Sequence, residues 1–146
     1  MKEKEIESLR HHFEIDETNI HKEVLEQATL YLRWAIKSAR SERRLKEIQM
    51  QTKVVAATEM KAIREEFFAK NGKELPATAS IDKTELPLRS AYQEQIRKQL
   101  DAEEELDILI AAREAARQRK DMITNYCLML REEVRSDIII KNRSEE

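Results

Sequence analysis

Residues 18–72 read TNIHKEVLEQATLYLRWAIKSARSERRLKEIQMQTKVVAATEMKAIREEFFAKNG, a stretch without proline whose only glycine stands at its last position. Its apolar residues recur at spacings of three and four, the pattern of one face of an α-helix. Asn71-Gly72 is a natural stop, since glycine readily adopts the left-handed conformation that ends helices. The stretch therefore predicts one helical arm over residues 18–71. The apolar residues are Ile20, Val24, Leu25, Ala28, Leu32, Ala35, Ile36, Ala39, Leu45, Ile48, Val54, Val55, Met60, Ile63 and Phe67.

A second helical pattern follows over residues 88–136, after a linker at residues 72–87 that is rich in turn-forming and small residues. A helix of roughly 50 residues would be about 75 Å long at about 1.5 Å per residue, and such a helix is seldom stable alone. We therefore expect an all-α helical hairpin. Apolar positions of the second arm are Leu88, Ala91, Ile96, Leu100, Leu106, Leu109, Ala112, Ala115, Ala116, Met122, Ile123, Tyr126, Met129, Leu130 and Val134.

The two ends of the chain are shorter segments. Residues 1–14 predict a short N-terminal helix, and residues 137–146 a C-terminal tail that frays. Residues 138–140 are three isoleucines, which are weak helix formers and could pair as a strand or pack into a neighbouring molecule. We expect residues 1–146 to form a single helical domain.

Polar residues and one proline mark where the arms begin. Asp16 and Thr18 are the candidates to cap the first arm, because their short side chains accept hydrogen bonds from free backbone N–H groups. Ser80 or Thr84 could cap the second arm, with Pro87 near its first turn, where the missing N–H is tolerated.

The composition suggests that one hairpin does not complete its own core. Of the 146 residues 38% are charged and 5% aromatic, with one glycine and two prolines, whereas ordinary domains contain about 7% glycine and about 5% proline. Two amphipathic arms with so few aromatic residues leave apolar stripes uncovered. We therefore expect a homo-oligomer, and a ring because closed symmetry avoids open-ended fibres.

The charges are unevenly distributed along the chain. Residues 1–30 carry four Lys or Arg against eight Asp or Glu, residues 31–73 eleven against five, and residues 74–146 twelve against sixteen. The overall charge of −2 excludes a general polyanion binder. Only the middle third is basic, so a phosphate backbone is expected there.

The usual signatures of catalysis, cofactors and metals are missing. One glycine excludes the glycine-rich phosphate and dinucleotide loops, and there is no CxxC or HExxH pattern. The three histidines, His11, His12 and His21, do not supply the paired Glu-x-x-His motifs of a di-iron bundle. We expect no enzymatic activity, no cofactor and no metal site.

The sequence also predicts a cytoplasmic protein. It contains no run of about 18 apolar residues and no secretory signal at its start, and its single cysteine, Cys127, cannot form an intrachain disulfide.

Several motifs recur in one order and spacing. Ile15-Asp16-Glu17-Thr18 precedes Leu30-Tyr31-x-Arg33-Trp34, and Ala116-x-x-Arg119-x-x-x-Ile123 comes later in a long amphipathic stretch. In this order they resemble the UvsY family, the recombination mediators of T-even-type phages. The similarity covers residues 13–54 and, more weakly, 106–130. Within residues 13–54, downstream of Trp34, the similarity also includes Lys37, Arg43, Ile48, Gln51, Lys53 and Val54.

The resemblance implies a role in DNA recombination and repair, in the host cytoplasm if the protein is phage-encoded. Members of the family form ring-like oligomers on single-stranded DNA coated by a single-strand-binding protein, and help a RecA-like recombinase nucleate a filament. They bind DNA through Lys and Arg residues just before a pair of aromatic residues and a glycine. Here Lys61 and Arg64, followed by Phe67-Phe68 and Gly72, match that stretch, and Lys70 and Lys73 stand alongside. The implied DNA-binding residues are Lys53, Lys61, Arg64, Lys70 and Lys73.

Other interpretations of individual residues remain open. Phe67 and Phe68 either pack against the helix core and linker or stack on unpaired bases. Trp34 and Tyr31 are expected to pack in interfaces rather than to stack on bases. A second basic group is a solvated face, a site for an acidic partner or an additional DNA contact. It comprises Arg33, Lys37, Arg40, Arg43 and Arg44.

A different class of function is also compatible with the pattern. A coiled-coil structural or assembly protein, such as a scaffold or adaptor, would use its charges only for solubility and pairing.

Overall fold

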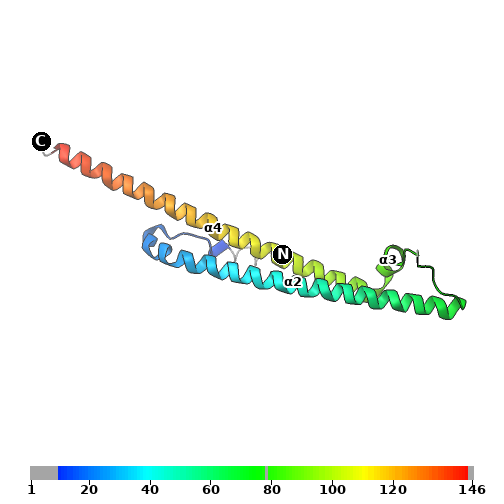
Figure 1. Cartoon of the computed structure of the whole chain (residues 1–146). Helices are drawn as coiled ribbons and strands as arrows, with labels where there is room; N and C mark the ends of the chain where they lie inside the picture. Colours follow the sequence, from blue (N-terminus) through cyan, green and yellow to red (C-terminus); the bar gives the residue numbers. More distant parts are fainter. Residues whose placement is uncertain (1–9, 78, 145–146) are drawn as a thin grey trace. The chain divides into compact units, whose positions relative to one another are not determined.

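The computed structural model describes residues 10–77 and 79–144, and within these ranges it contains helices and no strand (Figure 1). Two long helices dominate, α2 (Ile20–Asn71) and α4 (Ser90–Ser144). Three short elements accompany them, η1 (Glu17–Asn19), α3 (Ile81–Thr84) and η2 (Leu86–Leu88). The predicted all-α class is confirmed.

The end of α2 lies where the sequence places its stop. Gly72 has a φ of 63°, in the left-handed region. Its N–H donates to the carbonyl of Phe68 at 2.8 Å, which satisfies one of the last free carbonyls of the helix. The chain can leave the helix here because a residue without Cβ adopts this conformation at no steric cost.

The start of α2 is prepared by Asp16, as predicted. The Asp16 carboxylate accepts a hydrogen bond from the backbone N–H of Thr18 at 2.9 Å and another from the Thr18 hydroxyl. These bonds stabilise the charged carboxylate and lower the pKa of Asp16, the hydroxyl having the larger effect. Asp16 caps η1, which runs directly into α2 at Ile20.

The segment between the arms is more ordered than a plain loop. It contains α3 and η2, each anchored by one buried side chain. These are Ile81 in α3 and Leu86 in η2, which are 3% and 4% exposed.

The predicted cap of the second arm is wrong. Ser80 precedes α3 without a side-chain capping bond, and the Thr84 hydroxyl instead donates to the carbonyl of Ser80. Pro87 lies in η2, which stands between these residues and the first residue of α4, Ser90.

The prediction of a C-terminal tail over residues 137–146 is also wrong. Helix α4 continues through Ser144, beyond the expected end of the arm at residue 136. Each β-branched residue costs less than about 0.7 kcal/mol in a helix, and an existing helix gains a hydrogen bond with every added residue. Of the expected N-terminal helix, residues 1–9 lie outside the described residues, and residues 10 and 11 are helical.

The chain divides into two compact units where the sequence suggests a single domain. Unit 1 comprises Met1–Ser38 and Leu109–Glu146, and unit 2 comprises Ala39–Ile108. The two long helices therefore each contribute one part to each unit.

The core of unit 1 is built on Trp34. This side chain is 4% exposed and packs against Ala112 and Ala116, with Phe13 and Leu30 around it. The two alanines leave room for the indole between the helices. Trp34 thus belongs to the chain's own core, where the sequence suggests packing in an interface, and it is not available to stack on a base.

The core of unit 2 is small and partly polar. Its buried apolar side chains are Ile63, Ile81, Leu86 and Ala102, and its buried polar ones are Ser41, Thr52 and Gln95. The Thr52 hydroxyl and the Gln95 amide both donate to the carbonyl of Ile48, at 2.9 and 3.4 Å. Such a core buries little apolar area, so the hydrophobic effect contributes less here than in an ordinary domain.

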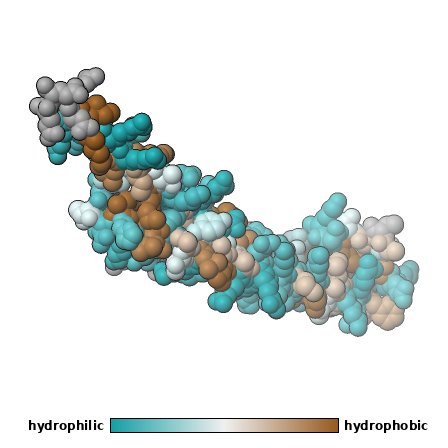
Figure 2. Space-filling model, turned by 60° about the vertical axis from the view of Figure 1, so that its left-hand side comes forward, coloured by the Kyte–Doolittle hydropathy of each residue, from teal (hydrophilic) through white to brown (hydrophobic). Residues whose placement is uncertain are grey.

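Large apolar side chains are exposed along both long helices, and Figure 2 shows them as brown areas on a largely hydrophilic surface. In unit 1, the orange and red end of α4 runs on past the start of α2 (Figure 1). Its exposed apolar residues are Leu128, Met129, Val134, Ile138, Ile139 and Ile140. Among the described residues, no helix is long and apolar enough to cross a bilayer.

Candidate nucleic-acid interface

Three of the predicted DNA-binding residues and one aromatic residue share a face of α2 in unit 2. Lys53, Lys61, Arg64 and Phe68 fall within about 80° of one another around the axis at 3.6 residues per turn. All four side chains are exposed, Phe68 by 55%. We call this set the cationic face; it combines the positive charge and the exposed ring that a single strand requires.

The carboxylates of Glu59 and Glu66 lie on the opposite side of the same helix. There Arg89, just before α4, places its guanidinium 4.0 Å from Glu59 and 2.6 Å from Glu66. The hydrogen bond from Arg89 lowers the pKa of Glu66, and the same bond raises the pKa of Arg89. Two carboxylates of the basic segment are thus turned away from the cationic face, and one guanidinium of the second arm offsets part of their charge.

The cations of this segment are only loosely held. Lys61 lies 3.8 Å from Glu65 in an exposed pair, which a phosphate can replace at little cost. Arg64 donates to the carbonyl of Leu75 at 3.4 Å. Lys70 is exposed in the last turn of α2, and Lys73 is exposed just after it.

A surface hollow of about 460 Å³ lies beside the cationic face. Arg64, Glu65 and Phe68 form the helical side, and Glu74 and Leu75 the side contributed by the returning chain. The hollow is bounded by an aromatic ring, a guanidinium and an aliphatic side chain, with two carboxylates among them.

The second basic group is more firmly paired within the chain. Lys37 lies 4.6 Å above the ring of Trp34, Arg43 pairs with Glu47 and Arg44 with Glu105, the last two at 3.1 Å. Arg33 and Arg40 are exposed. Glu105, the partner of Arg44, is the last residue of the acidic run Glu103 to Glu105. Glu103, the first residue of that run, accepts a hydrogen bond from Gln99 at 2.9 Å.

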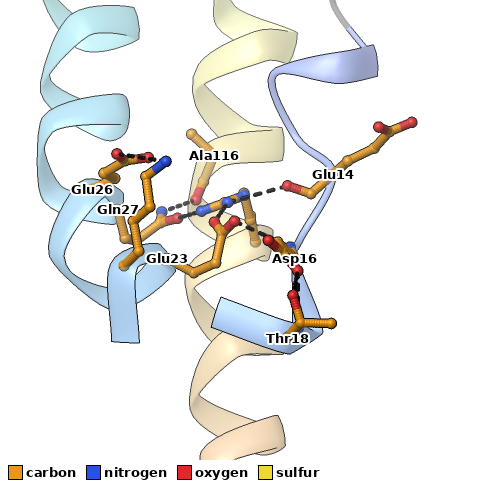
Figure 3. A network of polar contacts seen from close by, with 9 residues as sticks. Glu14, Asp16, Thr18, Glu23, Glu26, Gln27 and Ala116 are labelled. Atoms are coloured by element: carbon orange, nitrogen blue, oxygen red, sulfur yellow. Dashed lines mark hydrogen bonds and ion pairs between the residues drawn. The ribbon is translucent and has the colours of Figure 1, made fainter. Parts of the chain in front are cut away.

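A polar network in unit 1 surrounds Arg119, which belongs to the motif Ala116-x-x-Arg119-x-x-x-Ile123 and for which the sequence suggests no role. Arg119 on α4 is 6% exposed and bonds to the carboxylate of Glu23, the amide oxygen of Gln27 at 2.7 Å and the carbonyl of Glu14 at 3.2 Å. Gln27 in turn donates to the carbonyl of Ala116 at 2.6 Å. Figure 3 shows Glu23 and Gln27 directed toward the part of α4 that carries Ala116.

This network fastens three segments of unit 1 together. The Asp16 N–H donates to Glu23 at 3.1 Å, so the segment before η1 is tied to α2 as well as to α4 (Figure 3). Asp16 and Arg119, two residues of the recognised motifs, thus take part in this network, and Trp34, a third, lies in the core of unit 1. None of them lies on the cationic face.

No group of three or more His, Cys, Asp or Glu side chains within the described ranges could hold a metal ion. The imidazole of His11 lies 3.2 Å from the Glu14 carboxylate, and His12 stands edge-on to the ring of Trp34.

Comparison with known proteins shows a likeness in fold. No family model matches the chain, and no curated protein matches it. Among solved structures, the chain is similar to the recombination mediator protein UvsY of bacteriophage T4, with a TM-score of 0.72 and 20% sequence identity. The similarity covers 91% of this chain and 99% of that one. The resemblance to the UvsY family that the sequence indicates is thus confirmed at the level of the fold.

Proposed function

We propose that this protein is a recombination mediator that binds single-stranded DNA and promotes the loading of a RecA-like recombinase onto DNA coated by a single-strand-binding protein. The observation that carries the proposal is the likeness to the T4 mediator over nearly the whole length of both chains. The motif residues support it independently, because Asp16, Trp34 and Arg119 hold the core and the polar network of unit 1.

The cationic face is the proposed contact for the DNA backbone, extended by Lys70 and Lys73. Its cations are exposed, and Arg89 offsets part of the charge of the two carboxylates behind it. A homo-oligomer repeats this face on every subunit, so the positive field grows and several contacts act together on one strand. The overall charge of −2 is compatible with this, because the acidic residues lie mainly in other parts of the chain.

Mediation requires more than DNA binding. A mediator must favour the recombinase over a protein already bound to the strand, so it needs different affinities for two arrangements of the DNA. In our proposal the oligomer holds the strand in a shape that the coating protein tolerates poorly. The protein itself hydrolyses no nucleotide, needs no cofactor and acts in the cytoplasm.

The test is the lag before a cognate recombinase hydrolyses ATP on coated single-stranded DNA. Adding this protein should shorten the lag, and this protein alone should show no ATPase activity. DNA binding is verified separately by the shift of a labelled oligonucleotide. If binding is present but the lag is unchanged at saturating protein, the protein is a DNA-binding oligomer without mediator activity.

The competing candidate is a coiled-coil scaffold or adaptor, which the exposed apolar residues of the last part of α4 favour. A scaffold of this kind would not shift a labelled oligonucleotide at low salt. That gel-shift experiment separates the two classes before any recombinase is needed.

A further inference from the structure

The hollow beside the cationic face has the features of a seat for a planar ring. Phe68 follows Arg64 by four residues on α2, so their side chains are neighbours on the helix surface. Arg64 lines the hollow and donates a hydrogen bond to the carbonyl of Leu75, which lines it as well. Its guanidinium and the Phe68 ring are both planar groups on which a flat ligand can stack.

The opposite side of the hollow depends on the chain reversal at Gly72. After this residue the chain returns toward α2, and Glu74 and Leu75 line the hollow together with Phe68. The volume of about 460 Å³ lies in the range of about 300–1,000 Å³ that is usual for small-molecule sites.

The charges in the hollow suit a base and not a phosphate. Glu65 and Glu74 are both among its lining residues, and two carboxylates repel a phosphate group. Carboxylates accept hydrogen bonds from the amino groups on the edges of bases. Phosphates are attracted instead to Lys53 and Lys61, which lie on the same face but do not line the hollow.

We propose that this hollow holds one unpaired nucleobase of a bound single strand, stacked on Phe68, while the phosphates of that strand lie along Lys53 and Lys61. This inference rests on the proposed function, since it assigns the position of a base within the same interface.

The experiment compares two labelled strands of equal length by fluorescence anisotropy. One is oligo-deoxycytidine, whose bases carry the amino group from which a carboxylate can accept a hydrogen bond, and the other has the same phosphates but carries abasic tetrahydrofuran residues. Stacking on an aromatic residue strengthens binding by at least about fivefold per base, so wild-type protein should prefer the normal strand by at least that factor. Phe68→Leu, which keeps an apolar side chain but removes the ring, should abolish the preference.

Three further variants complete the comparison. Phe68→Tyr keeps the aromatic ring and should keep the preference. Met50→Ala removes another exposed apolar side chain of α2 in unit 2, one that is 68% exposed and does not line the hollow, and should leave the preference intact. Because Phe68 is exposed, Phe68→Leu leaves no buried cavity, and its helical content by circular dichroism should equal that of the wild type. The slope of affinity against salt should also stay unchanged, because no phosphate contact is lost.

The outcomes distinguish this inference from the proposed function. Equal binding of the two strands by the wild type, or an undiminished preference in Phe68→Leu, would overturn the base seat while leaving DNA binding intact. If neither strand binds at low salt, both proposals fail.

Discussion

The guanidinium of Arg89 lies 2.6 Å from the carboxylate of Glu66, on the side of α2 opposite to the cationic face. A residue of the second arm therefore offsets part of the negative charge on the helix that we propose binds DNA. The pKa of Glu66 is lowered mainly by this hydrogen bond.

Arg89→Gln should raise the pKa of Glu66 toward its ordinary value and weaken binding of single-stranded DNA, because Glu59 and Glu66 lose their positive partner. A carboxyl group with a lowered pKa stabilises the fold above the ordinary glutamate pKa, and this contribution is lost as the pH falls through the lowered pKa. The stability difference between variant and wild type should therefore be present at neutral pH and vanish in acid. The measurement is an NMR titration of the carboxyl carbons, together with urea unfolding at several pH values.

Lys98→Gln is the matched control for this prediction. Lys98 bonds to Glu94 at 2.8 Å and lowers the pKa of that carboxyl, so the variant removes the same charge from unit 2. It should raise the pKa of Glu94 and leave Glu66 unchanged. A Glu66 pKa that does not respond to Arg89→Gln would contradict the assigned cause.

Replacing Lys61 and Arg64 together by alanine should lower the affinity for single-stranded DNA and leave the oligomer intact. Loss of the Lys61 phosphate contact should flatten the log–log dependence of affinity on salt by about 0.7, the value per phosphate for single strands. Loss of Arg64, which lines the hollow, should lower the affinity further. Anisotropy titrations at several salt concentrations measure both effects.

A double variant that binds like the wild type would move the DNA site elsewhere. The next set to test is then the second basic group, Arg33, Lys37, Arg40, Arg43 and Arg44.

Arg119→Ala should destabilise the protein by about 3–5 kcal/mol, the usual cost of removing one partner from a buried charge pair. The Glu23 side chain is only 12% exposed, and Gln27 is buried, so both would lose their main partner without gaining water. Urea unfolding followed by the fluorescence of Trp34, the single tryptophan, reports on unit 1. Arg117→Ala, which removes an exposed arginine 3.9 Å from Glu114, should change the stability by less than about 0.5 kcal/mol.

We expect a stable homo-oligomer larger than a dimer, with α4 contributing to the contacts. Ile138, Ile139 and Ile140 are 54%, 50% and 65% exposed, which places a run of apolar surface in water unless another subunit covers it. Replacing all three by serine should reduce the mass measured by light scattering while α4 remains helical. A wild-type monomer at micromolar concentration would contradict the expectation.

The local parts of this fold are readable from the sequence. The period of three and four, the lone glycine at residue 72 and the short polar side chain of Asp16 each act within a few residues, and each produces the feature it predicts. The end of α4 is missed because the weak helix propensity of isoleucine counts for less than continuation of an existing helix.

The long-range parts are not readable in the same way. Arg119 meets Glu23 and Gln27, which lie 96 and 92 residues away, so no local spacing connects them. Arg89 and Glu66 are 23 residues apart, on either side of the linker. The sequence does not predict the short helices in that linker. The cationic face itself follows from helical spacing once α2 is known to be continuous, whereas its use by DNA stays a prediction.

The polar network of unit 1 also has a consequence for the order of events during synthesis. Arg119 reaches back to the carbonyl of Glu14 across 105 residues. At about 5–20 residues per second, the ribosome needs roughly 5–20 s to make that intervening chain. The parts of α2 and α4 that pair in unit 2 are closer in sequence, so they meet first. Until Arg119 has been synthesised, the segment before η1 lacks this hydrogen-bond partner. During that time the first part of α2 remains available to chaperones.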